Sequence, residues 1–284
     1  MNMNTDTKNN TDTKDKEKAV KTFQELNLVD DFLFAKVYSD AEICRISLEK
    51  ILKIKIKKIE FATEQKTIKN TYESKGVRLD IYIADDKGTI YNCEMQTVES
   101  LELPRRSRYY SSTIDNDQLL KGREYEELPI TYVIFICTFD YFREGRHIYT
   151  FEKTCREDKN IILGDEAYTI FLNSKGTMND VDEDVKEFLA YIENTTDDYA
   201  DKSQSEWIKK LHERVKDVKQ SKEMEVEFMT LLQRDREKKK EAIDGFILTL
   251  LSNGMSAQDI AEKANISVDY VNKLAANSAQ YQLT

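Results

Sequence analysis

Two acidic residues lie in the segment GVRLDIYIADDKGTIYNCEMQTV, which covers residues 76–98 and predicts two strands joined by a tight turn. Asp80 belongs to the first strand and Glu94 to the second. Carboxylate oxygens are ligands for Mg²⁺, which commonly uses one or two of them together with waters and substrate phosphates. A metal ion held in this way can activate water and stabilise charge on a phosphodiester. These residue types therefore fit phosphodiester hydrolysis with Mg²⁺ or Mn²⁺.

The turn between the two strands decides whether the carboxylates meet. A three-residue hairpin loop commonly ends in a residue with positive φ, usually glycine. If residues 86–88, which end in glycine, form such a loop, Asp80 falls opposite Glu94 and Arg78 falls opposite Gln96. Residues opposite each other share a face of the sheet. A loop of two or four residues would instead place the two carboxylates on opposite faces.

Two carboxylates that face each other across a strand pair repel, and a cation between them would offset the repulsion. The alternative is an ion-pair network of Asp80, Arg78 and Glu94 on an exposed sheet face. The residue pattern by itself leaves both interpretations open.

The flanking segments predict the elements that would position this pair. A helix with a slip in its apolar phase near Ser39, a lysine-rich strand and the hairpin are followed by a helix with Pro104 in its first turn and by two further strands. This order predicts an α/β sandwich around a small mixed sheet, with an all-α C-terminal extension. The predicted ranges are 30–52, 53–65, 76–98, 103–120, 130–139 and 166–172.

Shifts in composition divide the chain into four predicted parts. Residues 1–22 are mostly Asn, Thr, Asp and Lys, which cannot bury apolar surface, so we expect a disordered tail. Residues 23–200 form the predicted core. Residues 201–241 are a highly charged helical linker with sparse apolar positions, and residues 242–284 form a small helical tail.

The C-terminal tail resembles a helix-turn-helix segment. Ser256 with Asp259 marks one helix start, and a second helix is expected near Ser267. Lys273 of that second helix is a candidate DNA contact. The helix has one lysine and one aspartate, which is little for phosphate attraction. A structural or dimerising tail is the alternative, and a homodimer stays open.

The overall composition limits the function classes. The net charge is −10, which argues against a non-specific nucleic-acid coat protein but leaves room for local basic sites. The N-terminal residues lack the apolar stretch of a signal peptide, and the longest apolar runs are too short to span a bilayer. The four cysteines lack zinc-site spacing and are expected as free thiols. We therefore predict a soluble, cytoplasmic protein without membrane contact.

Basic residues at the start of the helix over 103–120 are candidate DNA contacts. Arg105 and Arg108 share a helix face at i and i+3, and helix N-termini favour phosphate. They would grip a DNA backbone beside the metal. The alternative is an ordinary solvated helix face.

The order of these motifs resembles the PD-(D/E)XK nuclease superfamily, and more narrowly its branch of recombination-promoting nucleases and transposases. The resemblance covers about residues 26–172, and its motifs stand in the expected order. They are DDFLFAKVY, GVRLDIYI, YNCEMQ, the helix that begins RRSRYYSS, and the apolar strand YVIFICTF.

The resemblance implies a restriction-endonuclease-like core in which Asp80 and Glu94 are metal ligands. Gln96 stands where the superfamily usually has lysine, and glutamine has no charge to neutralise an oxyanion. Arg78 is the candidate for the missing positive charge, with a salt bridge to Asp80 or Glu94 as the alternative.

The resemblance implies an Mg²⁺-dependent DNA endonuclease. Two alternatives use the same fold without catalysis: a DNA-binding or regulatory protein, and a module whose acidic face binds protein. The uncharged Gln96 and the net charge of −10 favour these alternatives.

Overall fold

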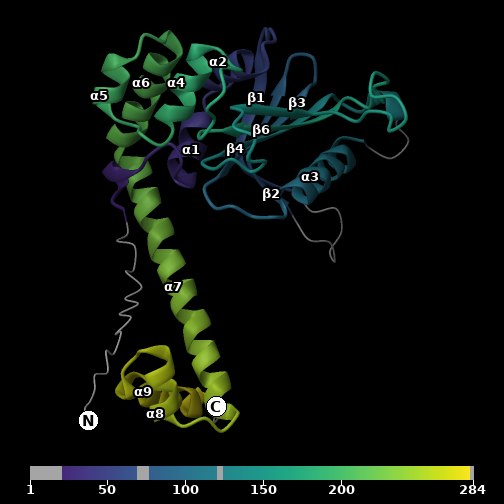
Figure 1. The fold of residues 1–284 in the computed structure, drawn as a ribbon. Helices are drawn as coiled ribbons and strands as arrows, with labels where there is room; N and C mark the ends of the chain where they lie inside the picture. The colour runs from purple at the N-terminus through teal and green to yellow at the C-terminus, as the bar shows by residue number, and fades with distance from the viewer. Residues whose placement is uncertain (1–20, 69–76, 120–123, 282–284) are drawn as a thin grey trace, which may run out of the picture. The chain divides into compact units, whose positions relative to one another are not determined.

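The computed structural model describes residues 21–68, 77–119 and 124–281 (Figure 1). The predicted disordered tail, residues 1–22, falls almost wholly outside the described residues. The chain divides into two compact units, residues 1–212 and residues 213–284.

Helices and strands mix along the first unit, and the second unit is helical in its described residues. Two short 3₁₀ turns, Phe23–Glu25 and Tyr125–Glu127, accompany the main elements. In chain order these are α1 (Asp31–Tyr38), α2 (Ala41–Leu52), β1 (Ile59–Ile68), β2 (Val77–Asp85), β3 (Ile90–Gln96), α3 (Leu103–Gln118), β4 (Thr131–Cys137), β5 (Ile148–Phe151), β6 (Ala167–Asn173), α4 (Glu183–Tyr191), α5 (Asp197–Lys202), α6 (Glu206–Gln220), α7 (Lys222–Ser252), α8 (Ala257–Ala264) and α9 (Val268–Tyr281).

Within the described residues, six strands form one mixed sheet in the order β1-β2-β3-β4-β6-β5. The β3, β4 and β6 strands run parallel, and the other neighbours pair antiparallel. Helix α3 packs on one face, where Tyr110 and Ile114 join Val133 and Phe135 in an apolar cluster. Helices α1 and α2 lie on the other face (Figure 1). The predicted α/β sandwich around a mixed sheet is confirmed.

The β2–β3 hairpin has the predicted register. Ile81 pairs with Cys93 and Ala84 pairs with Ile90, which leaves residues 86–88 as the loop. Gly88 has φ of 81°, a backbone conformation that is unfavourable for any residue with a side chain. The Gly88 N–H donates to the carbonyl of Asp85 at 3.1 Å. The turn residue therefore sets which side chains share a face.

The first helical segment is interrupted as its slipped apolar phase predicts. Residues 39 and 40 separate α1 from α2, and the Asp40 carboxylate caps α2 by accepting from the N–H groups of Glu42 and Ile43. An N-cap side chain satisfies backbone donors that lack partners at a helix start.

Two strand predictions need correction. The lysine-rich strand was expected from residue 53, but β1 begins at Ile59. Lys53 adopts a left-handed conformation (φ 55°) that ends α2, and the Ile56 N–H donates to Glu49 Oε1 at 2.9 Å, not to a neighbouring strand. The edge strand β5 was not predicted at all. It has only four residues, too few for an alternating pattern to stand out, and it is defined by its pairing with β6.

The C-terminal helices of the second unit pack around a small apolar cluster that includes Ile247, Ile260 and Val271. Ser256 caps α8 by accepting from the Asp259 N–H at 3.1 Å, as predicted. Asn265, with φ of 51°, makes the break before α9. Among the described helices, none has both the length and the apolar character needed to cross a membrane.

Candidate active site

The acidic pair lies where the β2–β3 ladder ends. Beyond the Ile81–Cys93 pair, the Asp80 N–H donates to Glu94 Oε1 at 3.1 Å, and the Met95 N–H donates to Asp80 Oδ2 at 3.1 Å. Each carboxylate thus accepts a backbone N–H from the opposite strand in place of a ladder bond. The structure brings Asp80 and Glu94 together, and these two bonds restrict both side chains.

The surroundings of the pair disfavour two bare negative charges. Glu94 is only 2% exposed and Asp80 is half-buried. Burial, and next the neighbouring Asp80 carboxylate, raise the pKa of Glu94 to about 8, although the Asp80 N–H acts in the opposite direction. A bound cation would favour the ionised form of both groups.

These residues fit a divalent ion that prefers oxygen ligands. Two adjacent carboxylates are a donor set that Mg²⁺ commonly uses. Among the residues that the structure describes, no group of three or more His, Cys, Asp or Glu side chains forms a metal cage. Water and substrate oxygens would therefore complete the coordination shell.

A positive charge reaches the acidic centre from α3. Arg106 donates from one terminal nitrogen to Gln96 Oε1 at 3.1 Å, and its other terminal nitrogen lies 3.6 Å from Glu94 Oε2. That second nitrogen also donates to the Tyr110 hydroxyl at 2.7 Å, and Nε does so at 3.2 Å. Arg106 thus joins Gln96, Glu94 and Tyr110, and about one third of its side chain is exposed.

Arg105 and Arg108, the arginines predicted from the sequence as DNA contacts, lie on either side of Arg106, for which no role was predicted. Arg105 and Arg108 are exposed, whereas Leu103 and Tyr110 are buried against the sheet. Residues three or four apart share a helix face, so the spacing from Leu103 to Tyr110 places Arg106 on the buried side. That apolar spacing is the signal that could have identified it.

Arg78, the sequence candidate for the positive charge, lies in β2 two residues before Asp80 and pairs with Thr67 of β1. Its side chain falls outside the described part of the structure. The role of Arg78 therefore stays a prediction.

A further polar side chain accompanies Glu94 on the same face of β3. Asn92 is completely buried, and its amide makes no hydrogen bond of normal geometry to a described residue. Its proximity lowers the pKa of Glu94. Asn92 was not among the predicted site residues, although a position two residues before Glu94 must share its face of the strand.

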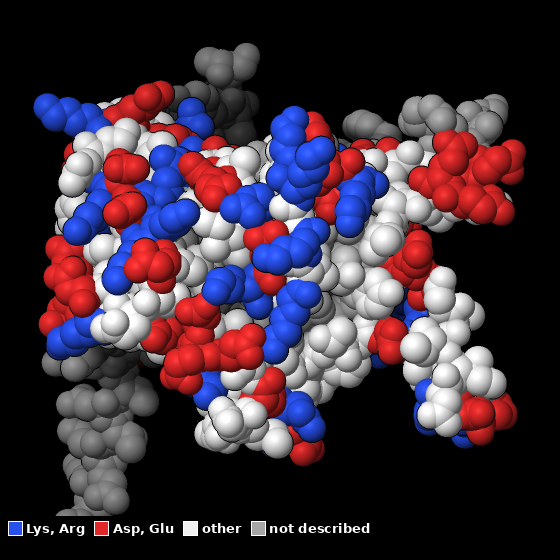
Figure 2. All heavy atoms as spheres, turned by 90° about the horizontal axis from the view of Figure 1, so that it is seen from above, with Lys and Arg blue, Asp and Glu red and all other residues white. Residues whose placement is uncertain are grey.

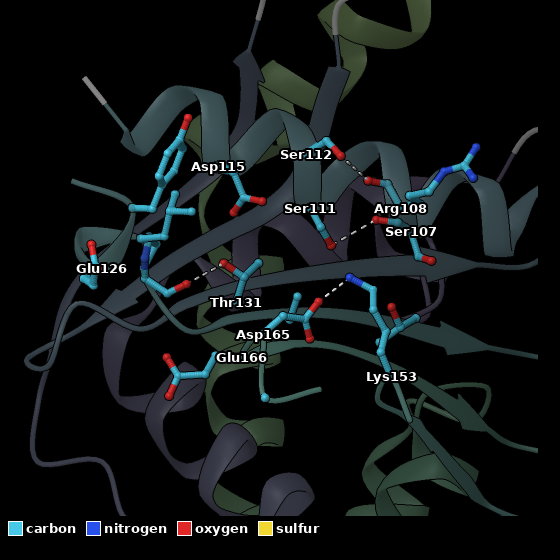
Figure 3. Close-up of a pocket in the computed structure, with 16 residues that line it drawn as sticks. Ser107, Arg108, Ser111, Ser112, Asp115, Glu126, Thr131, Lys153, Asp165 and Glu166 are labelled. Carbon is cyan, nitrogen blue, oxygen red and sulfur yellow. Dashed lines mark hydrogen bonds and ion pairs between the residues drawn. The ribbon is translucent and has the colours of Figure 1, made fainter. Parts of the chain in front are cut away.

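A pocket of about 590 Å³ lies beside α3, with Arg108 and Lys153 in its lining. Its lining residues are drawn in Figure 3. Lys153 forms an ion pair with Asp165. Four carboxylates lie in the same lining, so this pocket favours cations over phosphate and is a poor setting for a phosphate contact through Arg108. The four are Asp115, Glu126, Asp165 and Glu166.

Comparison with known protein families gives a match over most of the chain. A family model described as PD-(D/E)XK nuclease family transposase matches residues 28–244, which is more than half of the chain. The matched range includes Asp80, Glu94, Gln96 and Arg106 and ends within α7. No curated protein and no solved structure matches the chain significantly.

Proposed function

The chain belongs to the PD-(D/E)XK nuclease family transposases, and from that membership we propose that it is a DNA endonuclease that depends on Mg²⁺ or Mn²⁺. Nucleases of this family generally use divalent metal ions, and a nuclease family implies DNA as the substrate. The observation that carries the proposal is the acidic pair Asp80–Glu94 with Arg106 beside it.

In this proposal Asp80 and Glu94 hold the metal ion. A bound divalent ion lowers the pKa of water and stabilises negative charge on a phosphodiester. The protein contributes rigidity, because the N–H groups of Asp80 and Met95 hold the two carboxylates in place before substrate arrives. Pre-set geometry of this kind supplies a large part of catalysis in hydrolytic sites.

Gln96 and Arg106 together would replace the lysine that the superfamily usually has, Gln96 as a hydrogen-bond donor and Arg106 as the positive charge. Gln96 accepts from Arg106 through Oε1, so its Nε2 group is left to donate. Gln96 would therefore position a water or a phosphate oxygen by donation. Arg106 supplies the charge that glutamine lacks, and a guanidinium suits phosphate oxygens. Arg78 is a second candidate for that role, and Arg105 is a candidate contact to the DNA backbone.

The uncharged Gln96 favours one alternative, a protein that binds DNA through the nuclease fold without cutting it. Both functions predict DNA binding, and only the first predicts strand breaks that require a divalent ion.

A plasmid-nicking assay separates these functions. With Mg²⁺ or Mn²⁺ the wild-type chain should convert supercoiled plasmid to the nicked form, and Asp80→Asn should not. Glu144→Gln is the matched control, because Glu144 is exposed and lies outside the acidic centre. If folded wild-type protein leaves the plasmid intact with Mg²⁺ and with Mn²⁺, the chain is not an endonuclease and the DNA-binding alternative is favoured. If Asp80→Asn nicks plasmid as well as wild type does, the assignment of Asp80 as a metal ligand is wrong.

A further inference from the structure

Helix α7 lies wholly in the second unit, and its central turns are exposed to solvent. Every residue from 233 to 243 is exposed. Five of the seven residues from 234 to 240 are basic, in a chain whose net charge is −10. This stretch lies in the charged helical linker predicted over residues 201–241, but its charges are not evenly spread around the helix.

Three of the basic residues form one face. Arg236, Lys239 and Lys240 stand at i, i+3 and i+4, which places them side by side on an α-helix. We call these three residues the basic face of α7. Asp235 and Glu237 flank the basic face, but neither forms an ion pair with it among the described residues, and the Glu237 carboxylate accepts from the Gln233 amide at 3.0 Å. The three basic side chains are therefore not tied up by acidic neighbours on the described helix.

Some basic residues on other helices do form ion pairs within their own helix. Arg45 forms ion pairs with Glu42 and Glu49, and Lys202 pairs with Asp198, all at 2.7–2.8 Å. By contrast, no residue of the basic face has an ion-pair partner among the described residues. Arg236 and Lys240 are also like charges at i and i+4, which destabilises a helix. These neighbouring like charges suit an anionic ligand.

The basic face is long enough to reach neighbouring phosphates of a nucleic-acid backbone. The basic face spans about 6 Å of helix axis, and successive phosphates of one DNA strand are about 3.4 Å apart along the duplex axis. Other surfaces are less suitable. Helix α9 exposes Lys273 together with Asp269, and the face of the first unit in Figure 2 intersperses basic and acidic side chains.

We propose that the basic face of α7 binds the phosphate backbone of duplex DNA and supplies affinity, while chemistry stays at the acidic centre. The identity of the ligand rests on the proposed function. Ile243 and Phe246 are exposed next along the helix, at 43% and 64%, and their apolar surface makes a second copy of the chain the competing occupant.

The test compares two full-length triple variants with the same change in charge. Arg236→Gln/Lys239→Gln/Lys240→Gln removes the basic face, and Arg234→Gln/Lys238→Gln/Lys263→Gln removes three other exposed basic residues of the same unit. Glutamine preserves helix propensity. Duplex DNA binding is measured by fluorescence anisotropy over a series of salt concentrations in EDTA, so no cleavage is required. Circular dichroism confirms that the helices are retained.

Removing the basic face should weaken binding at low salt at least about tenfold and make the plot of log affinity against log salt shallower by about 2 to 3 units, since each phosphate contact contributes about 0.9. The control variant should keep most of the wild-type slope. Equal losses of DNA affinity in both variants would show that only the net charge matters, and would overturn the proposal. Unchanged DNA binding would overturn it as well, and if sedimentation then showed a dimer becoming a monomer, the face would belong to a second copy. Because binding in EDTA is independent of nicking, failure of one proposal is distinguishable from failure of the other.

Discussion

The acidic centre and the basic face of α7 both gather like charges, and they do so in opposite surroundings. Glu94 is 2% exposed, and it and Asp80 each accept a backbone N–H from the opposite strand. The basic face is exposed and has no ion-pair partner in the described chain. Charges interact strongly where protein excludes water, and salt screens them at the surface. Substitutions should therefore have large, specific effects in the first region and graded, salt-dependent effects in the second.

The largest effect is expected at Glu94. Glu94→Gln keeps the shape and the acceptor for the Asp80 N–H but removes a buried charge beside Asp80. Nicking should fall at least about 100-fold because the metal loses a ligand. The metal-free protein should become more stable, by about 1 to 3 kcal/mol, because burial and the Asp80 carboxylate disfavour the ionised form of Glu94 and glutamine carries no charge.

Thermal unfolding in EDTA and plasmid nicking together check this prediction. If the variant loses stability as well as activity, the charge of Glu94 stabilises the fold. The proposed difference between the acidic centre and the basic face of α7 would then be wrong.

Arg106 tests whether the charge beside the pair belongs to catalysis. Arg106→Gln should lower nicking by about 100-fold, the size of effect seen when a charge-stabilising donor is removed from an active site. It should also tighten binding of the divalent ion, because a positive charge 3.6 Å from Glu94 is gone. Titration calorimetry with Mn²⁺ measures the second effect.

Arg105→Gln is the control, since Arg105 is exposed on the same helix. Equal loss of nicking in both variants, with no change in ion affinity, would assign Arg106 to DNA contact alone.

Asn92 tests whether a buried uncharged side chain in the acidic centre contributes to activity without contributing to stability. Its amide has no described hydrogen-bond partner, so Asn92→Leu should leave stability unchanged or raise it slightly. If Asn92 orients Glu94, the same variant should reduce nicking by about tenfold, within the range for positioning effects. Wild-type nicking by a stable Asn92→Leu protein would show that the amide has no positioning role.

The smallest effects concern two glycines, one in each region. Gly88 has φ of 81° and Gly245 lies within α7, and a methyl group at either site would meet no atom within 4 Å. Gly88→Ala should cost about 1 kcal/mol because the turn requires a left-handed residue. Gly245→Ala should stabilise the helix by about as much, because alanine favours helix. Chemical denaturation of both variants measures the difference, and the same sign in both would contradict it.

The sequence by itself determined the acidic hairpin. Turn chemistry and alternation act over a few residues, so Gly88 and the two strands were enough to place Asp80 next to Glu94. The same local signals located α3, the buried strand β4 and the cap of α8 at Ser256. Each of these depends on residues close together in the chain.

Only the tertiary structure revealed the arginine that contacts the acidic centre. Local spacing predicted Arg78 for the positive charge and Arg105 and Arg108 for DNA contact, but the packing of α3 on the sheet placed Arg106 against Gln96. The edge strand β5 likewise exists through its partner β6. The burial of Glu94, which raises its pKa, also comes from packing against distant elements. Local patterns specify turns and faces, whereas the choice of the surfaces that meet is made by the whole chain as it buries its apolar area.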